Sequence, residues 1–217
     1  MQVNFGGFVA VSTIDWPGRS ACVVFLRGCP LRCTYCHNAP LQTGIDMRHT
    51  LDIMTMIKPS LPFITGVIFS GGEPTAQPDA LIDIAGMCKD NGLDIGIQTS
   101  GCFPWVLKDL LARKDDLIDM ISLDIKTSWD RYDNLVARDS AELVKESFTI
   151  CSDAWHRGVL TEMYIAHTVT PGHEDAVAWV ADLAGDIPMA LRRCNVGTAT
   201  IKDDTMAALI KRYVKKR

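Results

Sequence analysis

Short apolar runs rich in β-branched residues alternate along the chain with longer segments of helical periodicity. The strand candidates cover residues 21–28, 66–72, 94–101, 120–126, 162–169 and 189–196. Apolar residues recur at steps of three and four in residues 79–92, 103–116, 140–158, 173–186 and 203–217. Because a parallel connection between strands needs a crossover of a dozen or more residues, this alternation predicts an α/β fold with a parallel sheet.

Six strand and helix units are too few for the usual eight-stranded barrel, so we expect an open or partial (β/α)6 barrel. A length of 217 residues with 47% hydrophobic residues suits one domain. We expect residues 1–217 to form it, with 1–20 as a short extended lead-in that contains a DWPG turn. Functional loops of such sheets follow the carboxyl ends of the strands, where this chain has a cysteine-rich stretch, SGGEP, QTSG and DIK. These four polar clusters should meet at one rim.

The charge of the chain is balanced. It carries 26 acidic and 22 basic residues, for a net charge of -4, spread without a field of one sign that would favour nucleic acid or anionic membrane. No apolar run reaches the roughly 18 to 20 residues of a membrane span, and the first residues lack the pattern of a signal peptide. We therefore expect a soluble, cytoplasmic protein with neither nucleic acid nor membrane as a partner.

The chain has eight cysteines, of which three stand together. The isolated ones lie mostly in apolar segments, and we expect them to be buried, reduced thiols: Cys22, Cys88, Cys102, Cys151 and Cys194. The other three are Cys29, Cys33 and Cys36, in the stretch RGCPLRCTYCHN, residues 27–38, which we call the cysteine loop. Its three thiols need a chemical explanation.

Three kinds of site explain the cysteine loop poorly. A c-type haem site, suggested by CxxCH, requires export, and a redox CxxC pair opens a helix and has no third cysteine upstream. A structural zinc site is the strongest of these three alternatives, with His37 as a fourth ligand beside the three cysteines. Adjacent Cys36 and His37 rarely both reach one tetrahedral ion, however, and no second CxxC or HxxxH pair is present.

A 4Fe-4S cluster held by three thiolates explains the loop best. C-x3-C-x2-C lets a tight loop reach three corners of a cubane, and electron-transfer clusters take four cysteines. A set of three therefore indicates an iron kept open for another ligand. On this interpretation His37 is a neighbour of the cluster and not a ligand.

The cysteine loop resembles the signature C-x3-C-x-aromatic-C of the radical S-adenosylmethionine (SAM) enzymes, with Tyr35 in the aromatic position. The resemblance implies a six-unit partial barrel, in agreement with the strand count. It also implies two cofactors, a 4Fe-4S cluster on Cys29, Cys33 and Cys36 and S-adenosylmethionine, whose amino and carboxylate groups chelate the open iron. Tyr35 is then expected near the adenine.

The stretch SGGEP resembles the GGEP motif at the end of the second strand in this family. Gly71, Gly72, Glu73 and Pro74 are therefore expected to bind S-adenosylmethionine. Glycines let a main chain approach closely, and the carboxylate of Glu73, with nearby backbone groups, is able to accept hydrogen bonds from the ammonium of the ligand.

Two later motifs resemble further parts of the same binding site. In QTSG, Thr99 and Ser100 are expected to contact the carboxylate or ribose of S-adenosylmethionine. DIK resembles the DLK of glycyl-radical activating enzymes, which places Asp124 and Lys126 at the site. Residues two apart in a strand share one face, although a simple ion pair at a strand end is the structural alternative.

The chain departs from pyruvate formate-lyase activating enzyme at positions that matter for a cation. Gln98 and Ser122 stand where that enzyme has an aspartate and a methionine near a monovalent cation, so a cation site is in doubt. The same enzyme has an arginine near the end of its fifth strand, where this chain has Ala166 or His167. The sequence shows no second CxxC pair for an auxiliary cluster.

The short chain, the pair His37-Asn38 and the stretch STIDWPGR resemble the activating proteins of anaerobic ribonucleotide reductase. This resemblance implies reductive cleavage of S-adenosylmethionine to a 5'-deoxyadenosyl radical and abstraction of hydrogen from a glycine of a partner glycyl-radical enzyme. It also implies a low-potential electron donor such as flavodoxin or ferredoxin. Because the radical comes from the cofactor, no catalytic side chain is required, and Lys126 and His167 are retained as candidates.

Two alternatives to this function stay open. One is a radical enzyme acting on a small molecule, such as the synthase that contracts a pterin ring to a deazaguanine. It requires convergent polar groups, for which Arg192, Arg193, His167 and His173 are the candidates, unless these are solvated residues at strand and helix ends. The other is a zinc-bound module without enzymatic activity.

Overall fold

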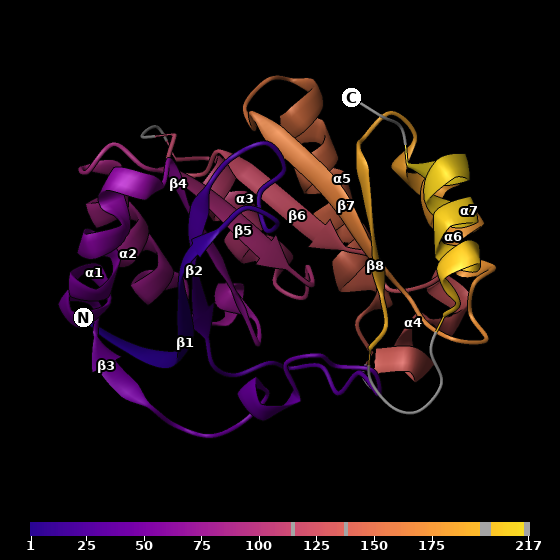
Figure 1. The fold of residues 1–217 in the computed structure, drawn as a ribbon, viewed down its shortest axis with the longest axis horizontal. Coiled ribbons are helices and arrows are strands. Elements are labelled where there is room, and N and C mark those ends of the chain that lie inside the picture. Colours follow the sequence, from indigo (N-terminus) through magenta and orange to yellow (C-terminus); the bar gives the residue numbers. More distant parts are fainter. Residues whose placement is uncertain (114–115, 137–138, 196–200, 215–217) are drawn as a thin grey trace.

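A computed structural model describes residues 1–113, 116–136, 139–195 and 201–214 (Figure 1). In these residues the strands form one eight-stranded sheet in the order β3-β1-β2-β4-β5-β6-β7-β8. The six predicted strands are all present and form its parallel part: β2 (Ala21–Leu26), β4 (Gly66–Gly71), β5 (Asp94–Thr99), β6 (Met120–Asp124), β7 (Glu162–Val169) and β8 (Met189–Arg193). The predicted α/β fold with a parallel sheet is confirmed.

The expected extended lead-in, residues 1–20, forms part of the sheet. Most of it is a regular strand, β1 (Gln2–Ser12), which pairs antiparallel with β2 and, at its start, with the short β3 (Met47–His49). The Gly-Gly pair inside β1 and the register shifts around it hide the alternation that marks a strand. The first twenty residues therefore extend the sheet beyond its parallel part.

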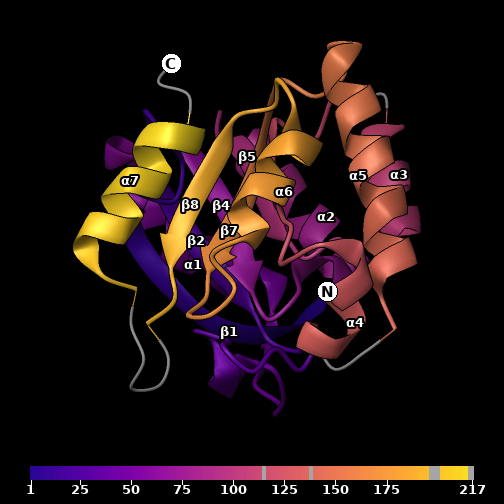
Figure 2. The same cartoon turned by 90° about the vertical axis from the view of Figure 1, so that its right-hand side faces the viewer.

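The predicted helices are present with shifted ends: α2 (Pro78–Lys89), α3 (Pro104–Leu111), α5 (Ala141–His156), α6 (Ala176–Ala184) and α7 (Asp203–Tyr213). The sequence did not predict α1 (Thr50–Ile57), α4 (Trp129–Val136) or the short 3-10 helices η1 (Ala39–Leu41), η2 (Lys58–Phe63) and η3 (Pro74–Ala76). Each of them has eight residues or fewer, too short for a clear periodicity. Figure 2 shows α3 and α5 along one flank of the sheet and α6 and α7 beside β7 and β8.

The sheet curves around a small inner layer of side chains. Trp16, from the DWPG turn, is fully buried there with Ala21, Val23, Ile68, Met120 and Tyr164, which project from strands of the sheet. A β-carbon added at Gly96 would lie 2.5 Å from Ile68 and 3.1 Å from Trp16, so glycine makes this close approach possible. Because these strands are parallel, the inner layer fills their amino-terminal half and leaves space at their carboxyl ends.

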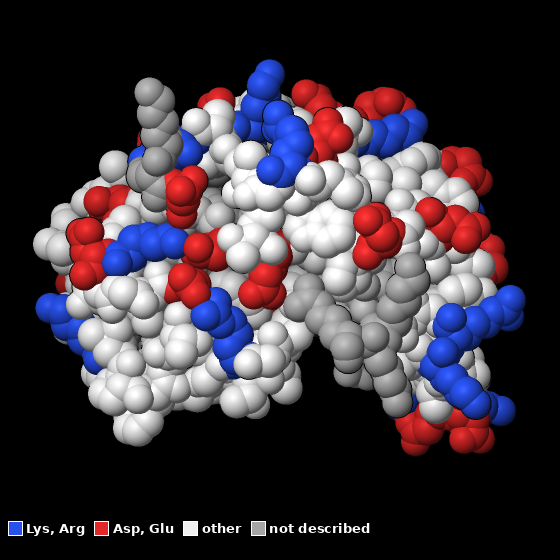
Figure 3. Space-filling view, turned by 90° about the horizontal axis from the view of Figure 1, so that it is seen from above, with Lys and Arg blue, Asp and Glu red and all other residues white. Residues whose placement is uncertain are grey.

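The surface carries mixed charges, as expected from the balanced composition. The face in Figure 3 shows acidic and basic side chains next to one another. No described helix is long and apolar enough to cross a membrane. All eight cysteines are free thiols, and the five isolated ones are buried, as predicted.

Candidate functional site

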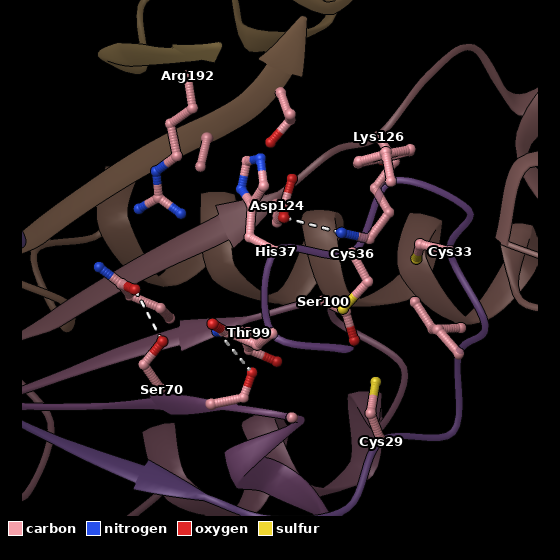
Figure 4. A pocket seen from close by; sticks show the side chains of 18 of the residues that line it. Cys29, Cys33, Cys36, His37, Ser70, Thr99, Ser100, Asp124, Lys126 and Arg192 are labelled. Atoms are coloured by element: carbon pink, nitrogen blue, oxygen red, sulfur yellow. Dashed lines mark hydrogen bonds and ion pairs between the residues drawn. The ribbon is translucent and has the colours of Figure 1, made fainter. Parts of the chain in front are cut away.

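A cavity opens at the carboxyl ends of the parallel strands, and we call it the main cavity. Its wall contains most of the site residues predicted from the sequence: Cys29, Cys33, Tyr35, Cys36, Gly71, Gly72, Thr99, Ser100, Asp124 and Lys126. Figure 4 shows Cys29, Cys33 and Cys36 on one side of this space and Arg192 on the other. Three of the predicted residues, Glu73, Pro74 and His167, are not part of its wall. The four motifs do meet at one rim.

Backbone and guanidinium hydrogen bonds hold the cysteine loop in place. The Gly28 N–H donates to the Leu41 carbonyl over 2.8 Å. The guanidinium of Arg27 donates to the carbonyls of Pro40 at 2.8 Å and Thr43 at 3.2 Å. These contacts tie the start of the loop to η1, so the loop follows a fixed path along the cavity.

The three thiols of the cysteine loop are half-buried on the same wall (Figure 4). Burial raises the pKa of Cys29 to about 11 and also raises the pKa of Cys33. Burial therefore favours the protonated thiol over the thiolate at both positions in the free protein. Because the thiolate is the metal ligand, binding a metal there must release protons.

The carboxylate of Glu73 is fully buried and accepts hydrogen bonds on both oxygens. Its Oε1 accepts from the hydroxyl of Thr99 at 2.7 Å and from the backbone N–H of Thr75 at 3.1 Å. Its Oε2 accepts from the backbone N–H of Ser100 at 2.8 Å. The hydroxyls of Thr75 and Ser100 add one bond each.

This geometry corrects the expectation for Glu73 and Pro74. The carboxylate was expected to accept hydrogen bonds from a ligand, but its acceptor sites are occupied by the protein, and it has no surface toward the main cavity. Pro74 is buried behind it as the first residue of η3. Glu73 instead joins the end of β4 to the end of β5, and it positions Thr99 and Ser100 on the cavity wall.

The glycines of SGGEP bring two segments of backbone into contact. A β-carbon at Gly72 would lie 2.3 Å from the carbonyl oxygen of Gly28, and one at Gly71, whose φ is +119°, would lie 2.4 Å from that of Leu26. The Glu73 N–H donates to the Gly28 carbonyl over 2.7 Å. The close approach that glycine permits here is between this motif and the start of the cysteine loop.

Asp124 and Lys126 form an ion pair on the cavity wall. Lys126 Nζ lies 2.8 Å from Asp124 Oδ2 and 5.9 Å from the centre of the Tyr35 ring. Burial opposes both charges, but their mutual attraction outweighs it: the pKa of Asp124 is lowered, and the pKa of Lys126 is raised well above its usual value. Asp124 Oδ1 has no hydrogen-bond partner among the residues that the structure describes.

The comparison with protein families agrees with this site. A model described as the radical SAM superfamily matches residues 23–180, which include the cysteine loop and the strands β4 to β7. The chain belongs to the radical SAM superfamily. Membership implies a 4Fe-4S cluster and S-adenosylmethionine as the cofactors of the family.

Curated relatives of this radical SAM protein include activating enzymes. A putative glycyl-radical enzyme activating enzyme of Methanocaldococcus jannaschii is 35% identical over 147 residues, 67% of this chain and 60% of the relative. The pyruvate formate-lyase-activating enzyme of Clostridium pasteurianum is 36% identical over 124 residues, 54% of this chain and 50% of that enzyme. The chain thus spans 50 to 60% of the length of these two relatives.

Solved structures share the fold at lower identity. The crystal structure of QueE from Escherichia coli is 16% identical to this radical SAM chain, with a TM-score of 0.61. The similarity covers 98% of this chain and 90% of QueE. It supports the partial barrel expected from the six strand and helix units.

The donors on the cavity wall fit an iron–sulfur cluster. No three Cys, His, Asp or Glu side chains of the described residues are arranged to hold a single metal ion. A cluster does not require that convergence, because it takes one thiolate at each of several separate irons. A radical SAM cluster of this kind would be held by Cys29, Cys33 and Cys36.

His37 is engaged with the opposite end of the sheet. Its Nε2 accepts a hydrogen bond of 3.0 Å from the backbone N–H of Asn195, which follows β8. Asn38, which the sequence analysis did not assign to the site, donates from its side chain to the Gly71 carbonyl over 3.2 Å. Both contacts connect the cysteine loop to the rim of the radical SAM barrel.

The remaining candidates do not all reach the main cavity. His167 is buried on the outer face, where its Nδ1 lies 2.7 Å from the Ile125 carbonyl and burial lowers its pKa. Ala166 lines the main cavity in its place. Arg193 pairs with Asp203 at 2.6 Å, and His173 lines a different cavity. Of the four residues proposed for a small substrate, Arg192 reaches the radical SAM site.

The two residues that put a monovalent cation site in doubt also lie on the wall of the main cavity. Gln98 and Ser122 both line the main cavity, and the hydroxyl of Ser70 donates to Gln98 Oε1 over 2.9 Å. Thr168, two residues beyond Ala166 in β7, lines it as well. Alternation along a strand would have indicated Thr168, because residues two apart share a face.

Replacing Tyr35 by phenylalanine is expected to leave stability unchanged or slightly improved. The Tyr35 hydroxyl is buried and has no hydrogen-bond partner among the described residues, so its removal loses no bond. We expect the free energy of unfolding of the cluster-free protein, from urea denaturation, to change by less than about 1 kcal/mol. Tyr132→Phe is the matched control, since its hydroxyl contacts the Asp124 carbonyl at 3.4 Å. A loss of stability above about 2 kcal/mol for Tyr35→Phe would mean that the Tyr35 hydroxyl does make a stabilising hydrogen bond.

The Asp124 and Lys126 pair predicts a pH dependence of stability. A carboxyl whose pKa is lowered on folding stabilises the protein above its unfolded pKa, near 4, and this contribution is lost as pH falls through the lower folded value. Urea denaturation of the cluster-free protein between pH 7 and pH 3 should therefore show the advantage of wild type over Asp124→Asn shrinking below about pH 4. A constant difference across this range would contradict the pairing.

Proposed function

We propose that this chain activates a glycyl-radical enzyme, by abstracting a hydrogen atom from a glycine of that partner. The observation that carries the proposal is the position of three thiols of one loop on the wall of a cavity at the carboxyl ends of the strands. The names of the relatives from Methanocaldococcus jannaschii and Clostridium pasteurianum support the reaction class. We further propose anaerobic ribonucleotide reductase as the partner, on the basis of STIDWPGR and His37-Asn38.

The residues of the main cavity have distinct parts in this proposal. Cys29, Cys33 and Cys36 would hold the 4Fe-4S cluster. The residues that would contact S-adenosylmethionine are Tyr35, Gly71, Gly72, Thr99, Ser100, Asp124 and Lys126. Bound together, the cluster and S-adenosylmethionine supply a 5'-deoxyadenosyl radical, with the electron coming from a low-potential donor such as flavodoxin or ferredoxin.

The protein around the cavity has to orient the reacting groups and exclude water. Glu73 fixes the hydroxyls of Thr99 and Ser100 by its own hydrogen bonds. The inner layer around Trp16 fills the amino-terminal half of the barrel, so the target is expected to enter from the carboxyl rim. Asp124 offers an oxygen that makes no hydrogen bond with the described part of the chain, next to the ammonium of Lys126. Both signs of charge are thus available to orient a zwitterionic amino acid group.

Electron paramagnetic resonance tests the function. The reconstituted protein is incubated without oxygen with a reductant and S-adenosylmethionine, in separate reactions with anaerobic ribonucleotide reductase, with pyruvate formate-lyase and with no partner. We expect a glycyl radical signal with anaerobic ribonucleotide reductase. A signal with pyruvate formate-lyase instead would keep the reaction and reject the proposed partner.

A small-molecule radical enzyme is the second candidate, and the position of Arg192 on the cavity wall favours it. An arginine facing a cavity is suited to a carboxylate or phosphate of a small substrate. Substantial 5'-deoxyadenosine without a glycyl radical on either partner would support this candidate over the first.

A further inference from the structure

Arg192 is a cation on the wall of the main cavity, and it is not among the residues proposed above to contact either cofactor. It lies on β8, and Figure 4 shows its guanidinium directed into the space between the strands. Its side chain makes no hydrogen bond or ion pair with any residue that the structure describes. Its one resolved influence is electrostatic: together with the closer Lys126, it lowers the pKa of Asp124. A guanidinium without a partner beside a cavity is free to bind an acidic group.

The main cavity has two sides, and Arg192 lies on the side away from the cysteines. The thiols and Lys126, whose Nζ lies 5.9 Å from the centre of the Tyr35 ring, form one side, where the cofactors are proposed to bind. Arg192 lies on the opposite side with Ala166 and Thr168 of the neighbouring strand. The side with Arg192 is therefore the one available to the molecule that reacts.

Small side chains leave room in front of the guanidinium. In the register between β7 and β8, Thr168 is opposite Arg192, and Ala166 is opposite Ala190, one step deeper on the same face. Because alanine side chains are small, this pair leaves space next to the Arg192 side chain. A group that enters from the rim can thus reach the guanidinium without displacing a side chain of this strand pair.

The neighbouring arginine does not share this position. Arg193 follows Arg192 in β8 and projects to the other face, where its Nη2 lies 2.6 Å from Asp203 Oδ1. The two residues have the same charge and adjacent positions in the sequence. They differ in which face of the sheet they occupy, so each is the natural control for the other.

We propose that Arg192 binds the substrate through an acidic group, and that it sets the position of the target rather than of the cofactors. Resting on the function proposed above, this assigns the acidic group to the protein loop that carries the target glycine. The guanidinium is suited to a carboxylate, since its planar N–H groups match both oxygens at once. Arg192 is then a specificity residue of the reaction.

The experiment compares Arg192→Gln with Arg193→Gln in the reconstituted enzyme. Three quantities are measured: the affinity for S-adenosylmethionine, the rate of 5'-deoxyadenosine formation without a partner, and the KM for the partner that gives a glycyl radical with wild type. For Arg192→Gln we expect a KM at least about tenfold higher, because a charge-assisted hydrogen bond to the partner is lost. The affinity for S-adenosylmethionine and the partner-free rate should change far less, since Lys126 still pairs with Asp124. Arg192→Lys should recover part of the loss. Arg193→Gln should leave all three at wild-type values.

The contrary results are distinct. Equal losses of S-adenosylmethionine affinity and of partner-free cleavage in Arg192→Gln would make it a cofactor residue and overturn the inference. An unchanged KM in Arg192→Gln would overturn it as well, while the function stands. If wild type forms no glycyl radical on any partner, the proposed function and this inference both fail.

Discussion

Replacing Cys33 by alanine is expected to abolish cleavage of S-adenosylmethionine. If Cys33 is one of three thiolate ligands, its loss leaves two ligands for the cluster. We expect the wild type, reconstituted without oxygen, to be brown and to contain about four iron and four sulfide ions per chain. Cys33→Ala should lose most of this metal, and 5'-deoxyadenosine formation should fall by about 100-fold or more, because a direct ligand matters at least as much as the groups that orient it.

Cys151→Ala is the matched control for the cysteine loop. Cys151 is a fully buried thiol of α5, and burial raises its pKa to about 12. Its replacement should cost about 1 kcal/mol of stability and leave metal content and cleavage near wild type. Equal losses in the two variants would mean that the ligands are misassigned. A colourless wild type that contains one zinc ion would reject the cluster itself.

Replacing Glu73 by glutamine is expected to destabilise the protein even without a ligand. The buried carboxylate accepts bonds from three hydroxyls and two backbone N–H groups, and glutamine turns one acceptor oxygen into a donor that faces other donors. Leaving a buried hydrogen-bond donor without an acceptor costs about 1–3 kcal/mol. Urea denaturation of the cluster-free protein without S-adenosylmethionine measures this change.

The Glu73 experiment separates a positioning role from a direct contact. If Glu73 acted only by binding the cofactor, Glu73→Gln would lower the affinity for S-adenosylmethionine and leave the stability of the ligand-free protein unchanged. That outcome would contradict the geometry of this carboxylate. Glu142→Gln is the control, because Glu142 is an exposed side chain of α5 whose ion pair with Lys145 lies on the surface. We expect no measurable change for it.

The parallel part of the fold could be predicted from the sequence because each strand there is a short apolar run. Buried on both faces, β4 reads as the continuous stretch GVIFSG, and β7 as EMYIAHTV. The antiparallel extension could not be predicted in the same way. In β1 the glycines Gly6 and Gly7 interrupt the alternation, and β3 has three exposed residues that gain their structure from pairing.

The sequence predicted which residues of the site come together better than what each of them does. Motifs at strand ends indicated the rim correctly, since the carboxyl ends of parallel strands share one edge. The role of Glu73 depends on Thr99 and Ser100, which are 26 and 27 residues away. Similarly, the contact of Gly72 with Gly28 joins distant segments. Such pairings arise from tertiary packing and leave no local pattern in the sequence.

Transfer of deuterium from a labelled partner tests the central claim most directly. The candidate glycyl-radical enzyme is prepared with glycine deuterated at its α-carbon and incubated without oxygen with the reconstituted protein, reductant and unlabelled S-adenosylmethionine. Mass spectrometry then measures the 5'-deoxyadenosine. We predict that it carries one deuterium from the partner, and that this label is absent with Cys33→Ala. Unlabelled 5'-deoxyadenosine, formed in the same amount with and without the partner, would contradict the account.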